Sequence, residues 1–120
     1  GEIGHMAVPG LTARCGCGQM GCLETVASKT GLVRLIRQAI KAGTACHLPE
    51  LVAGGAAGMK SSQLRAAWRA GCPATRQAVE VMTEHLAWGC GVIGQIIDPE
   101  CIVLGGGVME ALGRDLRPAL

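Results

Sequence analysis

Cys15-Gly16-Cys17-Gly18-Gln19-Met20-Gly21-Cys22 is the stretch of sequence that decides the local fold of this chain. Three of the seven cysteines lie within these eight residues, whereas the other four are scattered at positions 46, 72, 90 and 101. Clustered thiols in a chain with an odd number of cysteines indicate a metal site in a reducing compartment. Free thiols buried in a core are the alternative interpretation.

A fourth metal ligand is available upstream, at His5. Zn2+ prefers four thiolate or imidazole ligands in a tetrahedron, and a structural zinc site leaves no position open. Glycines between and beside the cysteines suit a backbone that must wrap a small sphere. We therefore predict one structural zinc ion whose binding is coupled to folding of the loop. Its predicted ligands are His5, Cys15, Cys17 and Cys22.

The composition describes one packed domain rather than a disordered chain. Of the 120 residues, 49% are hydrophobic and 17% are charged, with a net charge of +2. Eleven basic and nine acidic residues, two Trp and no Phe or Tyr provide neither a basic stripe nor stacking platforms for nucleic acid. The apolar run 86–97 is too short to cross a bilayer and predicts a buried helix. We expect a cytoplasmic protein with no membrane partner.

Spacing and turn residues predict mostly helices. Apolar residues at helical spacing predict a helix over 23–42, capped by Ser28 or Thr30 and ended by Gly43. Shorter and longer helices are predicted over 61–70 and from Pro73 to about Ile97. The segment 101–104 predicts a buried strand, and a short strand is expected near the start of the chain. Three glycines and a helix from about residue 108 follow this strand and complete an α/β unit. The cysteines at 72, 90 and 101 are interpreted as small core residues.

Two motifs resemble the ROK family, which comprises bacterial sugar kinases, related transcriptional repressors and uncharacterised open reading frames. They are Gly1-Glu2-Ile3-Gly4-His5-Met6 and the segment 15–24, which ends in Leu23-Glu24. The resemblance continues through Asp98-Pro99-Glu100 and Gly105-Gly106-Gly107-Val108. It implies an α/β fold that is part of an actin-like ATPase (ribonuclease H-like) fold, here a helix-rich fragment with few strands and a zinc-stabilised loop.

By this resemblance, residues 1–120 form a single partial domain from the middle-to-late part of a ROK protein, with the N-terminal ATPase domain absent. The sugar-binding and zinc loop is expected at 1–24, the helical region at 25–97, and the strand with its Gly-rich nucleotide turn at 98–110. A homodimer is also expected.

The resemblance assigns sugar contacts to three residues, Glu2, His5 and Glu24. Carboxylates can accept strong hydrogen bonds from neighbouring sugar hydroxyls, and a metal-bound imidazole keeps its second nitrogen for another contact. Taken alone, each glutamate is more simply a solvated residue, and Glu24 could merely favour a helix N-terminus.

The resemblance also places Gly105, Gly106 and Gly107 beside a nucleotide. Alone, this turn is more simply a tight connection, because it matches neither a P-loop nor a dinucleotide fingerprint. With the resemblance, it predicts contact with ATP, which would be used with Mg2+.

The main functional prediction is a fragment of an ATP-dependent hexose kinase, glucokinase-like, that transfers the γ-phosphoryl group of ATP to a hydroxyl of a hexose or N-acetylhexosamine. The family's general base lies in its N-terminal part, so we assign no catalytic residue here and expect the 120-residue chain alone to be inactive. The main alternative is a sugar-sensing ROK repressor, which would also bind DNA. A zinc-stabilised interaction module is a third interpretation. The intact three-glycine turn favours the kinase, since repressors of the family often lose this motif.

Overall fold

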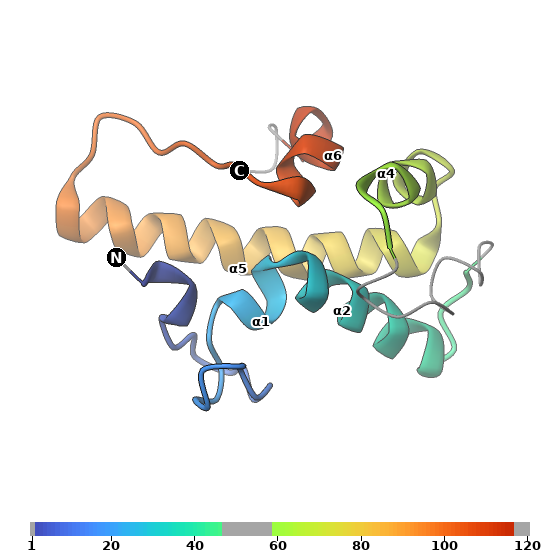
Figure 1. Cartoon of the computed structure of the whole chain (residues 1–120), viewed down its shortest axis with the longest axis horizontal. Coiled ribbons are helices and arrows are strands. Elements are labelled where there is room, and N and C mark those ends of the chain that lie inside the picture. The colour runs from blue at the N-terminus through green and yellow to red at the C-terminus, as the bar shows by residue number, and fades with distance from the viewer. Residues whose placement is uncertain (1, 47–58, 117–120) are drawn as a thin grey trace.

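The computed structural model describes residues 2–46 and 59–116. One long helix, α5 (Pro73–Ile97), runs the length of the molecule. The helices α1 (Glu24–Ala27) and α2 (Lys29–Lys41) lie along one side of it, and α4 (Ser61–Arg69) and α6 (Gly107–Leu116) lie on the other (Figure 1). A short 3-10 helix, η1 (Ile3–His5), begins the described chain.

The bounds of α5 follow from its terminal residues, as the sequence predicts. Pro73 occupies the first turn, where its missing N–H costs no helical hydrogen bond. The helix ends at Asp98, which adopts a left-handed conformation with φ of 47° and donates its N–H to the carbonyl of Gly94. Positive φ values at Gly43 and Gly71 likewise follow the ends of α2 and α4.

The helix predicted over 23–42 is divided at Ser28, one of its two candidate caps: Ser28 caps α2, as predicted, whereas residues 24–27 form the separate helix α1. Ser28 is extended, with φ of −115° and ψ of 164°, and its Oγ accepts a hydrogen bond from the N–H of Gly31 at 3.0 Å. The guanidinium of Arg34 donates to the carbonyl of Thr25 at 2.6 Å and so ties α2 back to α1. A capping serine therefore starts a second helix instead of reinforcing the first.

Buried aliphatic side chains from four helices form the core between α2, α4, α5 and α6. The largest fully buried ones are Leu32, Ile36, Leu64, Met82 and Leu112. A second, smaller cluster of Val8, Leu23 and Val26 lies beneath the N-terminal loop. Gly89 of α5 allows this cluster to approach closely, because a Cβ there would lie 2.8 Å from Leu23 Cδ2.

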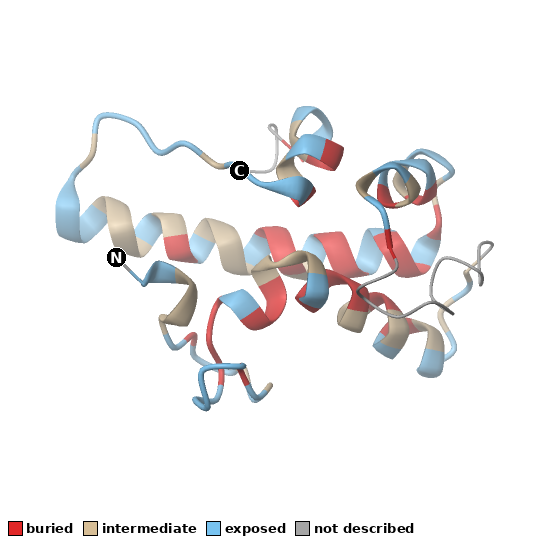
Figure 2. Cartoon of the chain, viewed as in Figure 1, coloured by how far each residue is buried: buried red, intermediate tan, exposed pale blue. Residues whose placement is uncertain are grey.

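The C-terminal half of α5 corrects the prediction of a buried helix over 86–97. Figure 2 shows buried residues concentrated in its first half, and Ile96 and Ile97 are 77% and 66% exposed. The sequence period is helical, but no described segment covers this end of the helix. Cys72 is buried as predicted, whereas Cys90 is only partly buried and Cys101 is exposed.

The predicted strand over 101–104 and the short strand near the start are also wrong. Within residues 2–46 and 59–116 there is no strand, and pairing is limited to the isolated bridges Ala7–Cys22 and Arg14–Met20. An extended segment needs a neighbour to accept its backbone hydrogen bonds. The segment 101–104 has none among the described residues, and Val103 is 87% exposed. In the described part of the chain, no helix is long and apolar enough to cross a membrane.

Candidate functional site

The N-terminal loop folds back on itself through main-chain hydrogen bonds. Leu23 donates to the carbonyl of Met6 at 2.9 Å, and Val8 donates to that of Gly21 at 2.8 Å. Gly21 has φ of 75°, and a Cβ on it would lie 2.5 Å from the carbonyl oxygen of Leu11, so this position requires glycine. The loop thereby brings the end of η1 beside the start of α1.

A tight turn presents the first two cysteines of the motif. The N–H of Gly18 donates to the carbonyl of Cys15 at 3.0 Å, and the N–H of Cys15 donates to that of Gln19 at 2.8 Å. Gly18 adopts φ of 93°, which a side chain would strain. The glycines of the motif therefore shape the loop as its spacing predicts.

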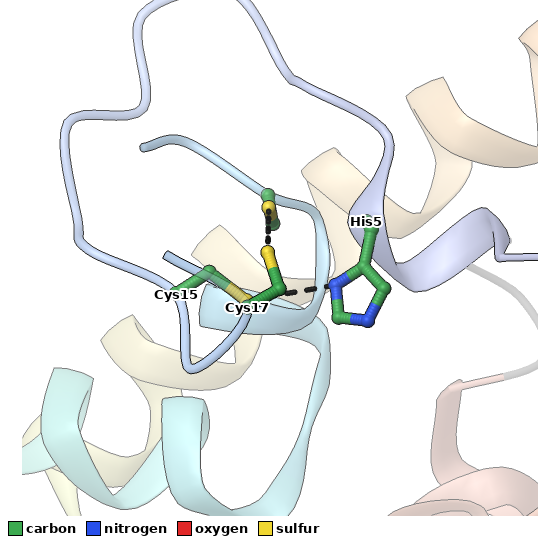
Figure 3. A group of neighbouring side chains, drawn as sticks. His5, Cys15 and Cys17 are labelled. Atoms are coloured by element: carbon green, nitrogen blue, oxygen red, sulfur yellow. Dashed lines mark hydrogen bonds between the residues drawn. The ribbon is translucent and has the colours of Figure 1, made fainter. Parts of the chain in front are cut away.

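His5, Cys15, Cys17 and Cys22 lie together, with their ligand atoms all within 4.8 Å of one another. Nδ1 of His5 is 3.6 Å from Sγ of Cys15, and the sulfurs of Cys17 and Cys22 are also 3.6 Å apart. Figure 3 shows the imidazole facing the cysteine side chains.

These separations fit a tetrahedral metal ion. Zinc–sulfur and zinc–nitrogen bonds of about 2.3 and 2.0–2.1 Å give tetrahedral edges of about 3.8 Å between sulfurs and about 3.6 Å between sulfur and nitrogen. The His5–Cys15 and Cys17–Cys22 separations both lie within about 0.2 Å of those edges. The remaining pairs of ligand atoms lie within 4.8 Å, so the four side chains could hold a metal ion if the more distant atoms moved by up to about 1 Å.

The thiols of the cluster differ in acidity. Burial, together with the neighbouring thiols, raises the pKa of Cys22 to about 12. A hydrogen bond from the main chain of Gln19 lowers the pKa of Cys17. Metal binding by the cluster must displace the proton of Cys22, because a thiolate is the ligand.

Two carboxylates border the cluster. Nε2 of His5, on the ring side away from Cys15, is 3.2 Å from Oε2 of Glu2, whose side chain is 84% exposed. Glu24 opens α1, and its Oε1 accepts a hydrogen bond from the thiol of Cys15 at 3.9 Å. The structure thus brings the three predicted sugar-binding residues to the rim of the cluster formed by His5 and the three cysteines.

A cavity of about 480 Å³ adjoins this rim and includes Cys15 and Glu24 in its wall. Its wall also contains Arg14 and Arg34, which the sequence analysis did not single out, and Ser28 and Thr30, which it named only as candidate helix caps. Arg14 directly precedes the motif, but no spacing rule marks it. The others face the cavity because the chain breaks at Ser28.

A second cavity, of about 200 Å³, contains the predicted nucleotide turn Gly105-Gly106-Gly107. Gly106 has φ of 95°, and its carbonyl accepts the first hydrogen bond of α6, from Glu110 at 2.9 Å. Ser28 borders both cavities, and Lys29, which the sequence analysis did not single out, borders this one. The glycine turn therefore lies next to the break between α1 and α2.

Curated relatives include both enzymes and regulators. A glucokinase of Halalkalibacterium halodurans is 33% identical over 98% of this chain and 36% of its own length. An N-acetyl-D-glucosamine kinase of Citrobacter koseri is 33% identical, over 90% and 34%. The DNA-binding transcriptional dual regulator NagC of Escherichia coli is 28% identical, over 100% and 28%. The chain spans about a third of the length of these relatives.

Solved structures that resemble the chain include those of two ROK proteins. A ROK family transcriptional regulator, a homologue of the E. coli MLC protein, superposes with a TM-score of 0.79 at 28% identity, over 99% of this chain and 28% of that one. A ROK family glucokinase from Streptomyces griseus, in complex with glucose and AMPPNP, superposes with a TM-score of 0.68 at 26% identity, over 98% and 41%. The model of the ROK family matches residues 1–114. This chain therefore belongs to the ROK family.

Proposed function

We propose that this chain is part of an ATP-dependent sugar kinase with an actin-like ATPase fold, in which a zinc-stabilised loop forms one wall of the sugar site. The observation that carries the proposal is the adjacency of two cavities at Ser28. One is bordered by Cys15 of the Cys/His cluster and by Glu24, and the other by the three-glycine turn. A kinase needs a sugar hydroxyl and a phosphate chain side by side.

His5, Cys15, Cys17 and Cys22 would hold the zinc ion in this proposal. Three thiols and one imidazole are the donor set that Zn2+ prefers, and four ligands leave no position open for substrate. The ion would supply structural stability and no chemistry. Its effect on the site is to fix the loop and the orientation of the His5 imidazole.

The sugar contacts we propose are those of Glu2, His5 and Glu24. With Nδ1 of His5 facing the cysteines, Nε2 is left to interact with a hydroxyl or with Glu2. Glu24 is exposed at the start of α1, so its carboxylate can accept hydrogen bonds from a ligand. The kinase relatives named for glucose and N-acetyl-D-glucosamine support a hexose or N-acetylhexosamine as the substrate.

ATP would approach the turn Gly105-Gly106-Gly107, and Mg2+ would accompany its phosphates. The turn has no side chains to keep phosphate oxygens away from main-chain N–H groups. Transfer of the γ-phosphoryl group to a sugar hydroxyl depends mainly on positioning and charge neutralisation. We assign no general base within this chain, so its residues would bind and orient the two substrates.

A sugar-sensing repressor is the second candidate, and the fold comparison favours it. Of the two solved structures described above, the regulator superposes with the higher TM-score, 0.79 against 0.68. A repressor would use the same metal cluster and sugar contacts, and it would bind DNA through another part of the protein. The glycine turn would then serve only as a connection.

Titration calorimetry on the complete protein, with glucose, N-acetylglucosamine and ATP–Mg2+ as separate titrants, tests the proposal. A kinase binds one of the sugars and ATP, and it forms sugar phosphate in a coupled assay. Binding of a sugar without any binding of ATP would contradict the kinase and support the repressor. The 120-residue chain alone is expected to form no sugar phosphate, and turnover by it would contradict our assignment of the general base elsewhere.

A further inference from the structure

Among the residues that the structure describes, Lys29 carries the single positive charge on the wall of the cavity at the glycine turn. The other lining residues outside the turn are neutral: Ala27, Ser28, Met82, Leu86, Leu104 and the pair Val108 and Met109. No carboxylate of residues 2–46 or 59–116 lines the cavity. In the part of the chain that the structure describes, Lys29 has neither a hydrogen bond nor an ion pair through its side chain.

This environment suits an anionic group better than a neutral one. An ammonium group beside an apolar wall is less screened than one in open water, so it attracts an anion more strongly. Three consecutive glycines in the wall leave space for a group with several oxygens, since a Cβ added to Gly105 or Gly106 would meet nothing within 4 Å. Lysine commonly binds phosphate in this way, as a point charge.

The position of Lys29 is fixed by the break between α1 and α2. Ser28 caps α2 through the N–H of Gly31, and Arg34 ties α2 to the carbonyl of Thr25. Lys29 therefore begins α2 at the point where the two cavities meet.

The helix α1 links Lys29 to the proposed sugar site. It is a single turn of four residues that begins at Glu24, in the wall of the larger cavity, and ends one residue before Ser28. A carboxylate for the sugar thus stands at the start of α1, and a charge for the phosphate follows two residues after its end. Phosphoryl transfer requires this kind of juxtaposition, with donor and acceptor held side by side.

We propose that Lys29 binds the phosphate chain of the nucleotide and positions it toward the sugar site. This inference rests on the proposed kinase function. It assigns to Lys29 a positioning role, the neutralisation of phosphate charge, and no proton transfer.

The test compares Lys29→Gln, Lys29→Arg and Lys29→Ala with Lys41→Gln in the complete protein. Lys41 is exposed, ends the same helix and lines neither cavity, so it controls for a general change of charge. Calorimetry measures the affinity for ATP–Mg2+, for adenosine and for whichever of glucose or N-acetylglucosamine the wild type binds. Thermal melting shows whether each variant is folded.

We expect Lys29→Gln and Lys29→Ala to weaken ATP binding by about tenfold, because one hydrogen bond to a charged group is lost. The affinities for adenosine and for the sugar should stay within about twofold of the wild type, and the KM for ATP should rise with that for sugar unchanged. Lys29→Arg should recover most of the ATP affinity, because it keeps the charge.

Unchanged ATP affinity in Lys29→Gln would overturn this inference and leave the kinase proposal standing. An equal loss of adenosine and ATP affinity would also overturn it, because the effect would then not arise from the phosphates. A wild-type protein that binds sugar but no ATP would overturn both the inference and the kinase proposal.

Discussion

Replacing Gly31 by alanine should damage the break between α1 and α2, on which both proposed substrate sites depend. A Cβ at Gly31 would lie 2.4 Å from the carbonyl oxygen of Thr25 and 3.0 Å from Cα of Val26. Both neighbours are main-chain atoms, so no side-chain rotation relieves the clash. The carbonyl of Thr25 must move by at least about 0.6 Å to reach the shortest separation that Cβ atoms show.

The cost follows from three terms. Overpacking of this kind costs about 1–3 kcal/mol, and the upper end applies because the clash is with main chain. Displacing the carbonyl of Thr25 also weakens its 2.6 Å hydrogen bond from Arg34, a charged donor, by about 1 kcal/mol. Against these losses, the higher helix propensity of alanine relative to glycine stabilises the folded state by about 1 kcal/mol. We expect a net loss of about 3 kcal/mol in the free energy of unfolding.

Thermal melting and urea denaturation of the complete protein measure this loss, with Gly91→Ala as the matched control. Gly91 is also a helical glycine, but in the described part of the chain a Cβ added to it would meet nothing within 4 Å. That variant should be as stable as the wild type or about 1 kcal/mol more stable. Gly31→Ala should also bind sugar more weakly, because Glu24 moves with α1, and should keep its metal. A melting temperature of Gly31→Ala equal to that of Gly91→Ala would refute the predicted clash at Gly31.

Three other substitutions test separate parts of the account. Glu24→Gln should weaken binding of the sugar by about tenfold in calorimetry, because a charged acceptor is lost, and should not lower the melting temperature. The control Glu84→Gln, on the exposed face of α5, should change neither quantity. Equal effects of the two variants on sugar binding would rule out a specific sugar contact at Glu24. Leu32→Ala should lower the free energy of unfolding by about 3 kcal/mol in urea denaturation, since Leu32 is 0% exposed, and a loss under about 1 kcal/mol would contradict its place in the core. Gly21→Ala should release metal at a lower chelator concentration than the wild type, because its Cβ would lie 2.5 Å from the carbonyl oxygen of Leu11 and distort the loop. Metal release at the same chelator concentration as the wild type would show that the loop tolerates the change.

The proximity of the three cysteines could be predicted from the sequence because they lie close together along the chain. Three cysteines within eight residues, with glycines between them, restrict the loop to shapes that bring the thiols together. The structure adds His5 at 3.6 Å from Cys15, as predicted. Its zinc ion stays a prediction, as do the sugar and nucleotide contacts.

Ser28 could be predicted as a candidate cap, but the separate helix α1 before it could not be predicted from helical periodicity. The apolar spacing continues through Ser28. The break is held by the hydrogen bond from the guanidinium of Arg34 to the carbonyl of Thr25, and by the close approach of that carbonyl to Gly31, which has no side chain. Such contacts depend on tertiary packing, which overrides local propensity. The cavities that meet at this break, with Arg14 and Lys29 in their walls, were missed for the same reason.

The strand predicted over 101–104 failed for a different reason. Its apolar composition suits a buried strand, but a strand also needs a partner for its main-chain hydrogen bonds. No described segment provides one, and Val103 remains 87% exposed. The exposed end of α5 likewise shows that apolar composition alone does not decide what covers a surface.

The metal content of the complete protein tests the central claim most directly. Elemental analysis of the purified protein should find about one equivalent of zinc per chain, bound by the four-ligand cluster. Cys101→Ser should keep that zinc, because Cys101 is exposed and outside the cluster, whereas Cys17→Ser should lose most of it. Under half an equivalent in the wild type, or equal zinc in the two variants, would contradict a zinc-stabilised wall of the sugar site.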